Sequence, residues 1–208
     1  MKTLALEMST ARGSIAVRDA GEALFDCQFA ADRKHSGAFF ENLEQCLKRC
    51  GHPEQIVVGL GPGSYAGVRI AIATALGLRP ATAAKLAGIP SICALDVEAG
   101  EYGVIGDARR QSFFFARVKE GRLVEGPILE SAPELQTRLK ELALVIYASE
   151  PLPQFPRATL AYPVAGRLAE LAREHASEIL DAPVLEPIYL REPHITVPRA
   201  HTAFVQTR

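Results

Sequence analysis

Residues 59–78 read Gly-Leu-Gly-Pro-Gly-Ser-Tyr-Ala-Gly-Val-Arg-Ile-Ala-Ile-Ala-Thr-Ala-Leu-Gly-Leu and join a predicted strand, 55–58, to a predicted helix. The turn holds glycines, which adopt positive φ at little cost, and a proline, which fixes φ and lacks an N–H donor. The helix carries almost no polar side chains, and a helix that is apolar on all sides must be buried by something. What lies against this helix therefore decides both the fold and the function.

Small residues recur at every fourth position of this helix, at Gly67, Ala71 and Ala75, so we predict that another backbone approaches closely along them. A second predicted helix, 36–50, is amphipathic and starts with paired phenylalanines. Together the two helices predict a surface for a partner protein, formed by Phe39, Phe40, Leu43, Leu47, Gly67, Ile70, Ala71, Thr74, Ala75 and Leu78. Because soluble proteins usually cover such an apolar patch, we predict a homodimer through the same helices when the partner is missing.

The predicted elements follow the order βββαβαβ in the first half of the chain and repeat that order in outline in the second. In the first half they are strands at 3–7, 14–18 and 23–29, the helix 36–50 with Ser36 as its N-cap, the strand 55–58, the Gly-rich helix, a short helix 81–87 after Pro80, and a strand 89–95. In the second half they are strands at 102–107, 112–119 and 122–130, a helix 133–142, a strand 144–147 and a helix 164–179. The repeat predicts two related lobes, 1–99 and 100–208, the second smaller and ending in a surface tail.

The Gly-rich turn has several chemical interpretations. Gly61-x-Gly63-x-x-Ala66 satisfies the dinucleotide fingerprint, but three antiparallel strands precede it and no acidic residue ends a strand about 20 residues later. A Walker P-loop is excluded because no Lys-Ser or Lys-Thr follows, and Ser64 is misplaced for a nucleophile elbow. Backbone N–H groups at a helix N-terminus can still bind an anion. From the residues alone, phosphate contact and simple close packing are equally supported.

The composition is that of an ordinary soluble globular protein. The 208 residues are 48% hydrophobic and 23% charged, and the net charge of −1 argues against a chain-wide affinity for nucleic acid. Cys46 and Cys50 are interpreted as apolar residues of a helix and not as metal ligands, and we predict no catalytic or metal-binding residue. Arg109 and Arg110 are interpreted as a solvated turn, not an RNA contact. The apolar segments are too short for a signal peptide or a membrane span, which predicts a cytoplasmic protein with no membrane contact.

Six segments carry a family resemblance that extends over nearly the whole chain: 4–10, 14–17, His35-Ser36, the Gly-Pro-Gly-Ser-Tyr-Ala-Gly-Val-Arg run at 61–69, 107–110 and 187–191. The chain resembles the branch of the actin-like ATPase superfamily that contains TsaD and its paralogue TsaB (YeaZ). The resemblance implies an α/β, two-lobe actin-like ATPase fold (ASKHA, ribonuclease H-like). It also marks candidate nucleotide or anion contacts, namely Ser9, Thr10, Gly61, Gly63, Ser64 and Arg69.

Within this branch the chain is most similar to the short TsaB type. The TsaD type holds a metal with two histidines after the Gly-rich helix, and the corresponding stretch 89–99 contains none. Glu7 stands in place of the usual aspartate and Ala66 in place of the usual threonine, which both reduce the prospect of ATP chemistry. The resemblance therefore implies a non-catalytic, activating subunit of a TsaD-type transferase, which threonylcarbamoylates adenosine 37 of tRNAs that read ANN codons.

The same resemblance implies the partners: a TsaD-type transferase, a TsaE-type ATPase, and tRNA only through the complex. It implies no cofactor of the chain's own, with ATP or ADP at the interface with the partner. Two alternatives stay open. One is a self-standing nucleotide-binding transferase or peptidase-like enzyme of the same superfamily, and the other is a dinucleotide-binding domain.

Overall fold

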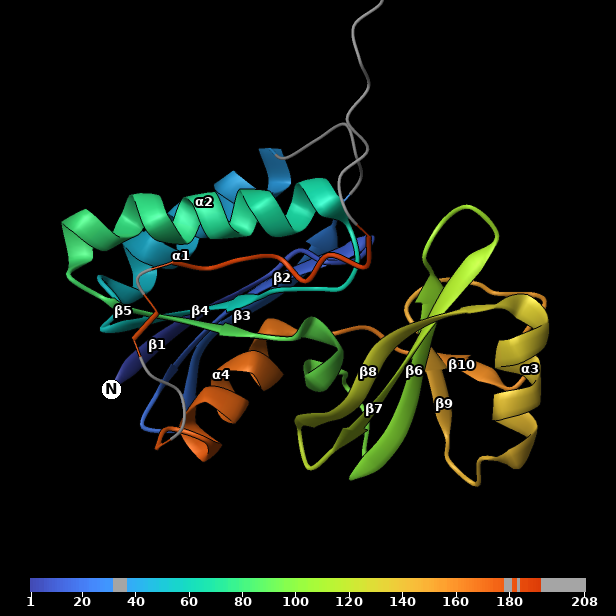
Figure 1. Ribbon diagram of the computed structural model, residues 1–208. Helices are drawn as coiled ribbons and strands as arrows, with labels where there is room; N and C mark the ends of the chain where they lie inside the picture. Colours follow the sequence, from blue (N-terminus) through green and yellow to red (C-terminus); the bar gives the residue numbers. More distant parts are fainter. Residues whose placement is uncertain (32–36, 178–180, 183, 192–208) are drawn as a thin grey trace, which may run out of the picture.

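The computed structural model describes residues 1–31, 37–177, 181–182 and 184–191, and places them in two five-stranded sheets with helices on their faces (Figure 1). The predicted N-cap Ser36 and the His35-Ser36 pair lie outside the described residues. The two-lobe α/β fold that the sequence predicted is confirmed by this arrangement.

The first sheet has the order β3-β2-β1-β4-β5. Its strands are β1 (Lys2–Glu7), β2 (Arg12–Asp19), β3 (Glu22–Ala30), β4 (Gln55–Gly59) and β5 (Lys85–Ile89). The first three strands are antiparallel and joined by short turns, whereas β4 runs parallel to β1 and β5 parallel to β4. This order contradicts the dinucleotide-binding alternative, since an antiparallel meander contributes three of the five strands.

Side chains alternate between the two faces of a strand, so each face of the first sheet has its own cover. Helices α1 (Gly37–Cys50) and α2 (Tyr65–Thr82) cover the face that carries Leu4 and Leu6. Helix α4 (Ala165–Glu174) covers the opposite face, where Leu168 packs with Ala5 and Val57 (Figure 1). The sequence predicted α4 as part of a second lobe formed by residues 100–208, but the structure packs it against the first sheet.

The second sheet has the order β10-β9-β6-β7-β8, which repeats the sequence of connections in the first sheet. Its elements are β6 (Glu101–Asp107), β7 (Ser112–Lys119), β8 (Arg122–Ser131), α3 (Ala132–Glu141), β9 (Ile146–Ala148) and β10 (Ala158–Leu160). Helix α3 packs on one face of this sheet, with Leu135 against Ile105 and Phe115. The other face contributes Phe114 and Val104 to the core that holds α4, so the two sheets share one hydrophobic core.

The segment after α2 differs from the prediction. Pro80 lies in the last turn of α2 without ending it, and Ala83 ends the helix in the left-handed conformation with its N–H donating to the Arg79 carbonyl. The chain then forms β5 and a short 3-10 helix, η1 (Ser91–Ala94). The predicted helix 81–87 and strand 89–95 were therefore wrong. The short apolar run of β5 pairs with β4 at the edge of the sheet, and such runs carry no periodicity that separates strand from helix.

The described part of the C-terminal tail crosses from the first sheet to the second (Figure 1). The Ala182 N–H donates to the Leu86 carbonyl at 2.8 Å, and the Ile188 N–H donates to the Leu60 carbonyl at 2.9 Å. Leu185 is buried in the core beneath α2. At its described end, the Arg191 guanidinium donates to the carbonyl of Ala108 at 3.2 Å. The tail is thus part of the fold up to residue 191.

Candidate functional site

The Gly-rich turn is packed against the chain's own β1–β2 turn. The Ser64 N–H donates to the Ser9 carbonyl at 2.6 Å. A Cβ on Gly63 would lie 2.1 Å from that same oxygen, and a Cβ on Gly67 would lie 2.0 Å from the Met8 carbonyl oxygen. Real side chains do not approach so closely, so both positions require glycine. The glycines of the family signature serve this contact.

The donors of the turn are largely satisfied within the chain. The Gly61 N–H donates to Ser91 Oγ at 2.9 Å, and the Leu60 N–H donates to the Ile89 carbonyl at 2.9 Å. Ser64 caps α2, since its Oγ accepts from the Gly67 N–H at 3.3 Å. The space between this turn and the β1–β2 turn is filled by backbone. These residues therefore do not fit a nucleotide phosphate held between the two turns of this chain.

The other predicted anion contacts lie apart from one another. Ser9 is buried with the turn, whereas Thr10 is half-buried and its Oγ1 accepts from the Arg12 N–H at 3.1 Å. Arg69 lies on the exposed side of α2, with its guanidinium 5.0 Å from the centre of the Tyr65 ring. The structure thus brings Ser9, Gly63 and Ser64 together and leaves Thr10 and Arg69 outside that contact.

Glu7 lies completely buried below the turn, at the end of β1. Its Oε1 accepts from the Ser9 N–H at 2.6 Å. Burial raises the pKa of the carboxyl above its usual range, and hydrogen bonding to Ser9 and Ser91 offsets part of that rise. A Cβ on Gly59 would lie 1.9 Å from Glu7 Oε2, so this glycine makes room for the carboxyl. Glu7 is a core group in this fold and does not face solvent.

The small-residue stripe of α2 does not face solvent. Ala71 and Ala75 are fully buried in the core beneath the helix, and Gly67 lies against Met8. Phe39 and Leu43 of α1 are buried in the same core. A backbone does approach this stripe closely at Gly67, but it belongs to the chain's own β1–β2 turn. Because the sheet covers Ala71 and Ala75, the stripe is not exposed to a partner in this structure.

A different line of small residues forms the solvent face of α2. Ala66, Ala73 and Gly77 are exposed, and nothing lies within 4 Å of a Cβ built on Gly77. Leu76 is 40% exposed beside them. No charged residue occurs between Arg69 and Arg79, so this face is apolar over more than two helical turns. Of the predicted interface residues, those that reach the surface fully or in part are Phe40, Leu47, Ile70, Thr74 and Leu78.

The exposed face of α2 could not be predicted from the sequence, because the helix is apolar on both sides. Helical spacing groups Gly67 with Ala71 and Ala75, and it groups Ala66 with Ala73 and Gly77 equally well. No local signal separates the two faces: the hydrogen bond from the Gly67 N–H to Ser64 Oγ is local, whereas the Met8 carbonyl that packs on Gly67 comes from a turn more than 50 residues away in sequence. We refer below to Ala66, Ile70, Ala73, Leu76 and Gly77 as the α2 solvent face.

In the described part of the chain, no three His, Cys, Asp or Glu side chains come close enough together to hold a metal ion. Cys46 is buried on the inner side of α1, and burial raises its pKa to about 12. A thiol with that pKa carries almost no thiolate at neutral pH and behaves as a small apolar side chain. No helix among the described residues is long and apolar enough to cross a bilayer.

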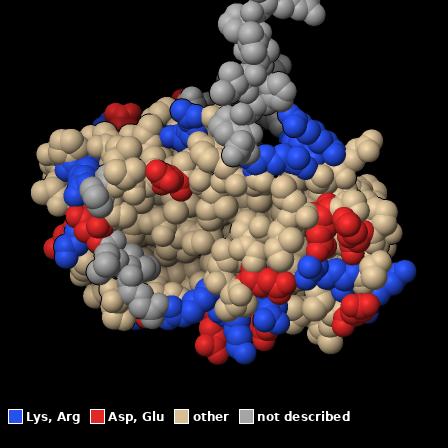
Figure 2. Space-filling view, viewed as in Figure 1, with Lys and Arg blue, Asp and Glu red and all other residues tan. Residues whose placement is uncertain are grey.

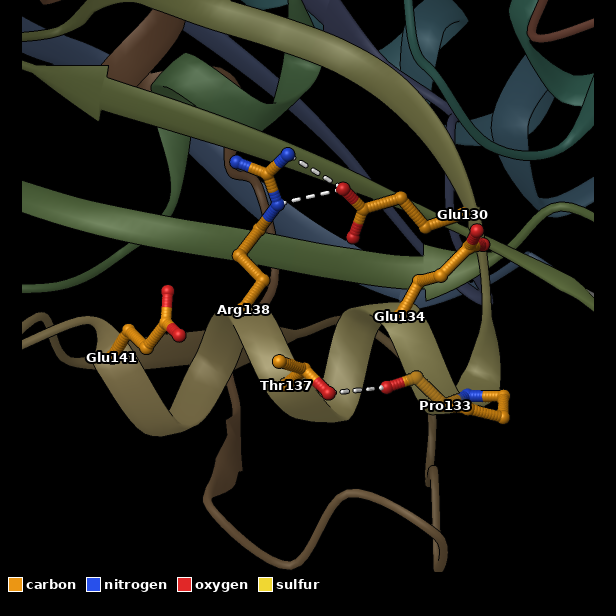
Figure 3. A pocket seen from close by; sticks show the side chains of 6 residues that line it. All are labelled: Glu130, Pro133, Glu134, Thr137, Arg138 and Glu141. Carbon is orange, nitrogen blue, oxygen red and sulfur yellow. Dashed lines mark hydrogen bonds and ion pairs between the residues drawn. The ribbon is translucent and has the colours of Figure 1, made fainter.

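A hollow of about 560 Å³ lies beside α3 (Figure 3). It is lined by Glu130, Pro133, Glu134, Thr137, Arg138 and Glu141. Arg138 pairs with Glu130 at 2.6 Å and with Glu125 at 3.0 Å. The guanidinium is thereby neutralised within the protein and is not available to an anionic ligand.

Most of the chain matches a known protein family. The family model of TsaD, tRNA N6-adenosine threonylcarbamoyltransferase, matches residues 29–175. Two solved structures from Pseudomonas aeruginosa share the fold: an uncharacterised protein with similarity to the peptidase YeaZ (TM-score 0.74, 24% identity) and YeaZ itself (TM-score 0.70, 22% identity). Each similarity covers 91% of this chain and 99% of the other.

Two mycobacterial relatives match a shorter part of the chain. An uncharacterised protein of Mycobacterium leprae is 34% identical over 83 residues, which are 39% of this chain and 23% of that protein. An uncharacterised protein of Mycobacterium bovis is 31% identical over 83 residues, or 39% of each chain. The matched part thus spans well under half of these relatives.

Proposed function

The chain belongs to the family of TsaD, the tRNA N6-adenosine threonylcarbamoyltransferase, and from that membership we propose that it is a non-catalytic subunit. In this proposal the chain binds a separate TsaD-type transferase and activates it. The observation that carries the proposal is the α2 solvent face, an apolar helix surface with small residues that the described part of the chain leaves uncovered.

The non-catalytic role is supported by the region around Ser91. The stretch from Ile89 to Ala99 holds no histidine, although the resemblance places the metal-binding pair of the catalytic type there. All four residues of η1 are buried, and Ser91 uses its hydroxyl to hold the Gly61 N–H. Glu7, the residue at the position of the family's usual aspartate, is sealed in the core. These positions maintain the fold and offer no group to a substrate.

Partner binding is supported by the shape and chemistry of the α2 solvent face. Helices pack at 8–10 Å between axes depending on the side chains at the contact, so Ala73 and Gly77 favour the closer end of that range. Interface cores are depleted in charge and enriched in aromatic side chains. The face is uncharged, and Phe40 of α1 is 49% exposed. A helix pair of the transferase would complete a helical bundle here.

The remaining members of the proposed system follow from the resemblance. A TsaE-type ATPase joins the complex, tRNA binds to the complex, and ATP or ADP lies at the boundary with the transferase. Without the transferase, the α2 solvent face pairs two copies of this chain as a homodimer. The proposed location is the cytoplasm. The packing of Gly63 against Ser9 disfavours the alternative of a self-standing nucleotide-dependent enzyme.

The test is co-purification with the TsaD-type protein from the same source. Ala73→Glu places a charge at the centre of the α2 solvent face and is expected to abolish association while the chain stays folded. Ala176→Glu makes the same change at an exposed alanine just beyond α4 and is expected to leave association intact. Retention of the partner by the Ala73→Glu variant would place the interface elsewhere.

A further inference from the structure

The C-terminal tail brings a second tyrosine to the start of α2. The centroids of the Tyr65 and Tyr189 rings lie 5.5 Å apart, with 35° between the ring planes. Both rings are exposed, by 54% and 45%. The Arg69 guanidinium lies 5.0 Å from the centre of the Tyr65 ring. An exposed aromatic pair with a cation beside it results, built from two segments that only the folded chain brings together.

The same tail segment anchors a basic turn of the second sheet. Two residues after Tyr189, Arg191 donates to the Ala108 carbonyl and, at 2.7 Å, to Ser112 Oγ. Between these two residues, three successive positions adopt positive φ: Arg109 at 65°, Arg110 at 53° and Gln111 at 60°. Non-glycine residues adopt this conformation rarely, and it persists where the surrounding structure holds it. The turn presents all three side chains to solvent.

The charges along this edge are mostly unneutralised. Arg109 is paired with Asp107 at 3.3 Å, and Glu150, the other acid at this turn, accepts from the Asp107 N–H at 2.9 Å. Among the described residues, Arg69, Arg110 and Arg191 have no carboxylate partner. In Figure 2, Lys and Arg side chains gather at the edge of the molecule where Figure 1 places the turn between β6 and β7. The net charge of −1 means that this positive potential is local.

Exposed rings next to unpaired guanidinium groups are the arrangement with which proteins bind single-stranded nucleic acid. Bases stack on the rings, and arginines contact phosphates. A duplex cannot use the rings, because its bases already stack on one another, whereas loops present splayed bases. The chemistry of this edge therefore favours a looped or single-stranded RNA over a helical one.

We propose that Tyr65, Tyr189, Arg69, Arg110 and Arg191 form an RNA contact surface that binds the single-stranded loop of the tRNA within the complex. The identity of the RNA rests on the proposed function, while the surface rests on the geometry above. The interpretation of Arg109 and Arg110 is revised accordingly. From the sequence they were interpreted as a solvated turn, whereas in the structure the C-terminal tail joins that turn to the Tyr65–Tyr189 pair.

The experiment titrates a fluorescein-labelled hairpin RNA with the sequence of a tRNA anticodon arm and follows its anisotropy. Arg110→Gln is expected to weaken binding about fivefold and to reduce the slope of log affinity against log salt by about 0.7, the value for one phosphate contact on a single strand. Tyr189→Ser is expected to weaken binding about tenfold by loss of stacking, while Tyr189→Phe, which keeps the ring, binds as wild type. Arg49→Gln, an exposed arginine at the end of α1, is the charge-matched control and is expected to change nothing.

The titration is run on the chain alone and on its complex with the transferase, with complex formation measured first by gel filtration. Arg110→Gln and Tyr189→Ser are expected to keep the complex. If the complex forms but neither variant weakens RNA binding, the RNA contact surface is refuted and the proposed function stands. If no complex forms, the proposed function fails and the titration of the chain alone still decides the surface. The surface is also refuted if the wild-type protein binds no RNA either alone or in the complex. It is likewise refuted if Arg49→Gln weakens RNA binding as much as Arg110→Gln does.

Discussion

The backbone nitrogen of Ser64 donates a 2.6 Å hydrogen bond to the carbonyl oxygen of Ser9, which closes the Gly-rich turn onto the turn between β1 and β2. Gly63, directly before Ser64, and Gly67, three residues after it, both lie against the β1–β2 turn. The most recognisable stretch of the sequence is therefore used inside the molecule. The surface on which the proposed function depends is the other side of the same helix.

A first prediction concerns two glycines of α2. Gly67→Ala drives a Cβ into the Met8 carbonyl oxygen and should lower the free energy of unfolding by about 1–3 kcal/mol, as overpacking does. Gly77→Ala meets nothing within 4 Å and should raise it by about 0.5–1 kcal/mol, because alanine is the better helix former. Urea denaturation of both variants measures the difference. Equal effects of the two substitutions would contradict the assignment of the two helix faces.

A second prediction separates folding from association. Ala71→Glu buries a carboxylate without a partner in the core and is expected to unfold the chain or to leave it aggregated. Ala73→Glu, two positions later, is expected to fold normally and to convert the homodimer to a monomer in sedimentation velocity at micromolar concentration. Circular dichroism reports the folding of each variant. A folded Ala71→Glu variant, or a dimeric Ala73→Glu variant, would overturn this account of α2.

A third prediction follows from the raised pKa of Glu7, whose ordinary value is 4.5. At pH values between 4.5 and the folded-state pKa, the native chain binds more protons at this carboxyl than the unfolded chain does. The contribution of Glu7 to stability is therefore complete below pH 4.5 and is lost as the pH rises through the folded-state pKa. Glu7→Gln removes this titration, so the stability of the variant relative to wild type should increase from pH 5 to pH 8. Denaturation midpoints at both pH values test this, and a constant difference would contradict it.

A fourth prediction concerns nucleotide. Because backbone fills the space between the Gly-rich turn and the β1–β2 turn, the isolated chain should not bind ATP or ADP, with or without Mg²⁺. Isothermal titration calorimetry on the purified chain provides the measurement. Saturable binding in this experiment would favour the alternative of a self-standing nucleotide-dependent enzyme.

The sequence predicted the architecture because its patterns are local. The three-strand meander, the strand at 55–58 and the change to helical period in α1 are each visible in runs of neighbouring residues, and all three are confirmed. The orientation of α2 was not predictable in this way. Both Ala71 and Ala73 are small and apolar, and only the sheet beneath the helix decides which of them is buried.

Long-range pairings account for the other differences. Helix α4 packs on the first sheet although the whole second sheet, residues 101–160, lies between β5 and α4 in sequence. No local sequence pattern predicts that long-range contact. The tail bonds of Ile188 to Leu60 and of Arg191 to Ala108 likewise join segments far apart in the chain. The Tyr65–Tyr189 pair depends on both, so the RNA contact surface is visible only in the folded chain.

The central claim is that the α2 solvent face activates a separate transferase, and a reconstituted activity assay tests it most directly. The TsaD-type protein from the same source is assayed for threonylcarbamoylation of tRNA alone, with wild-type chain, with Ala73→Glu and with Ala176→Glu. The account predicts activity with the wild-type and Ala176→Glu chains, and none above the transferase alone with Ala73→Glu. Full activation by a folded Ala73→Glu chain, or full transferase activity without any added chain, would contradict it.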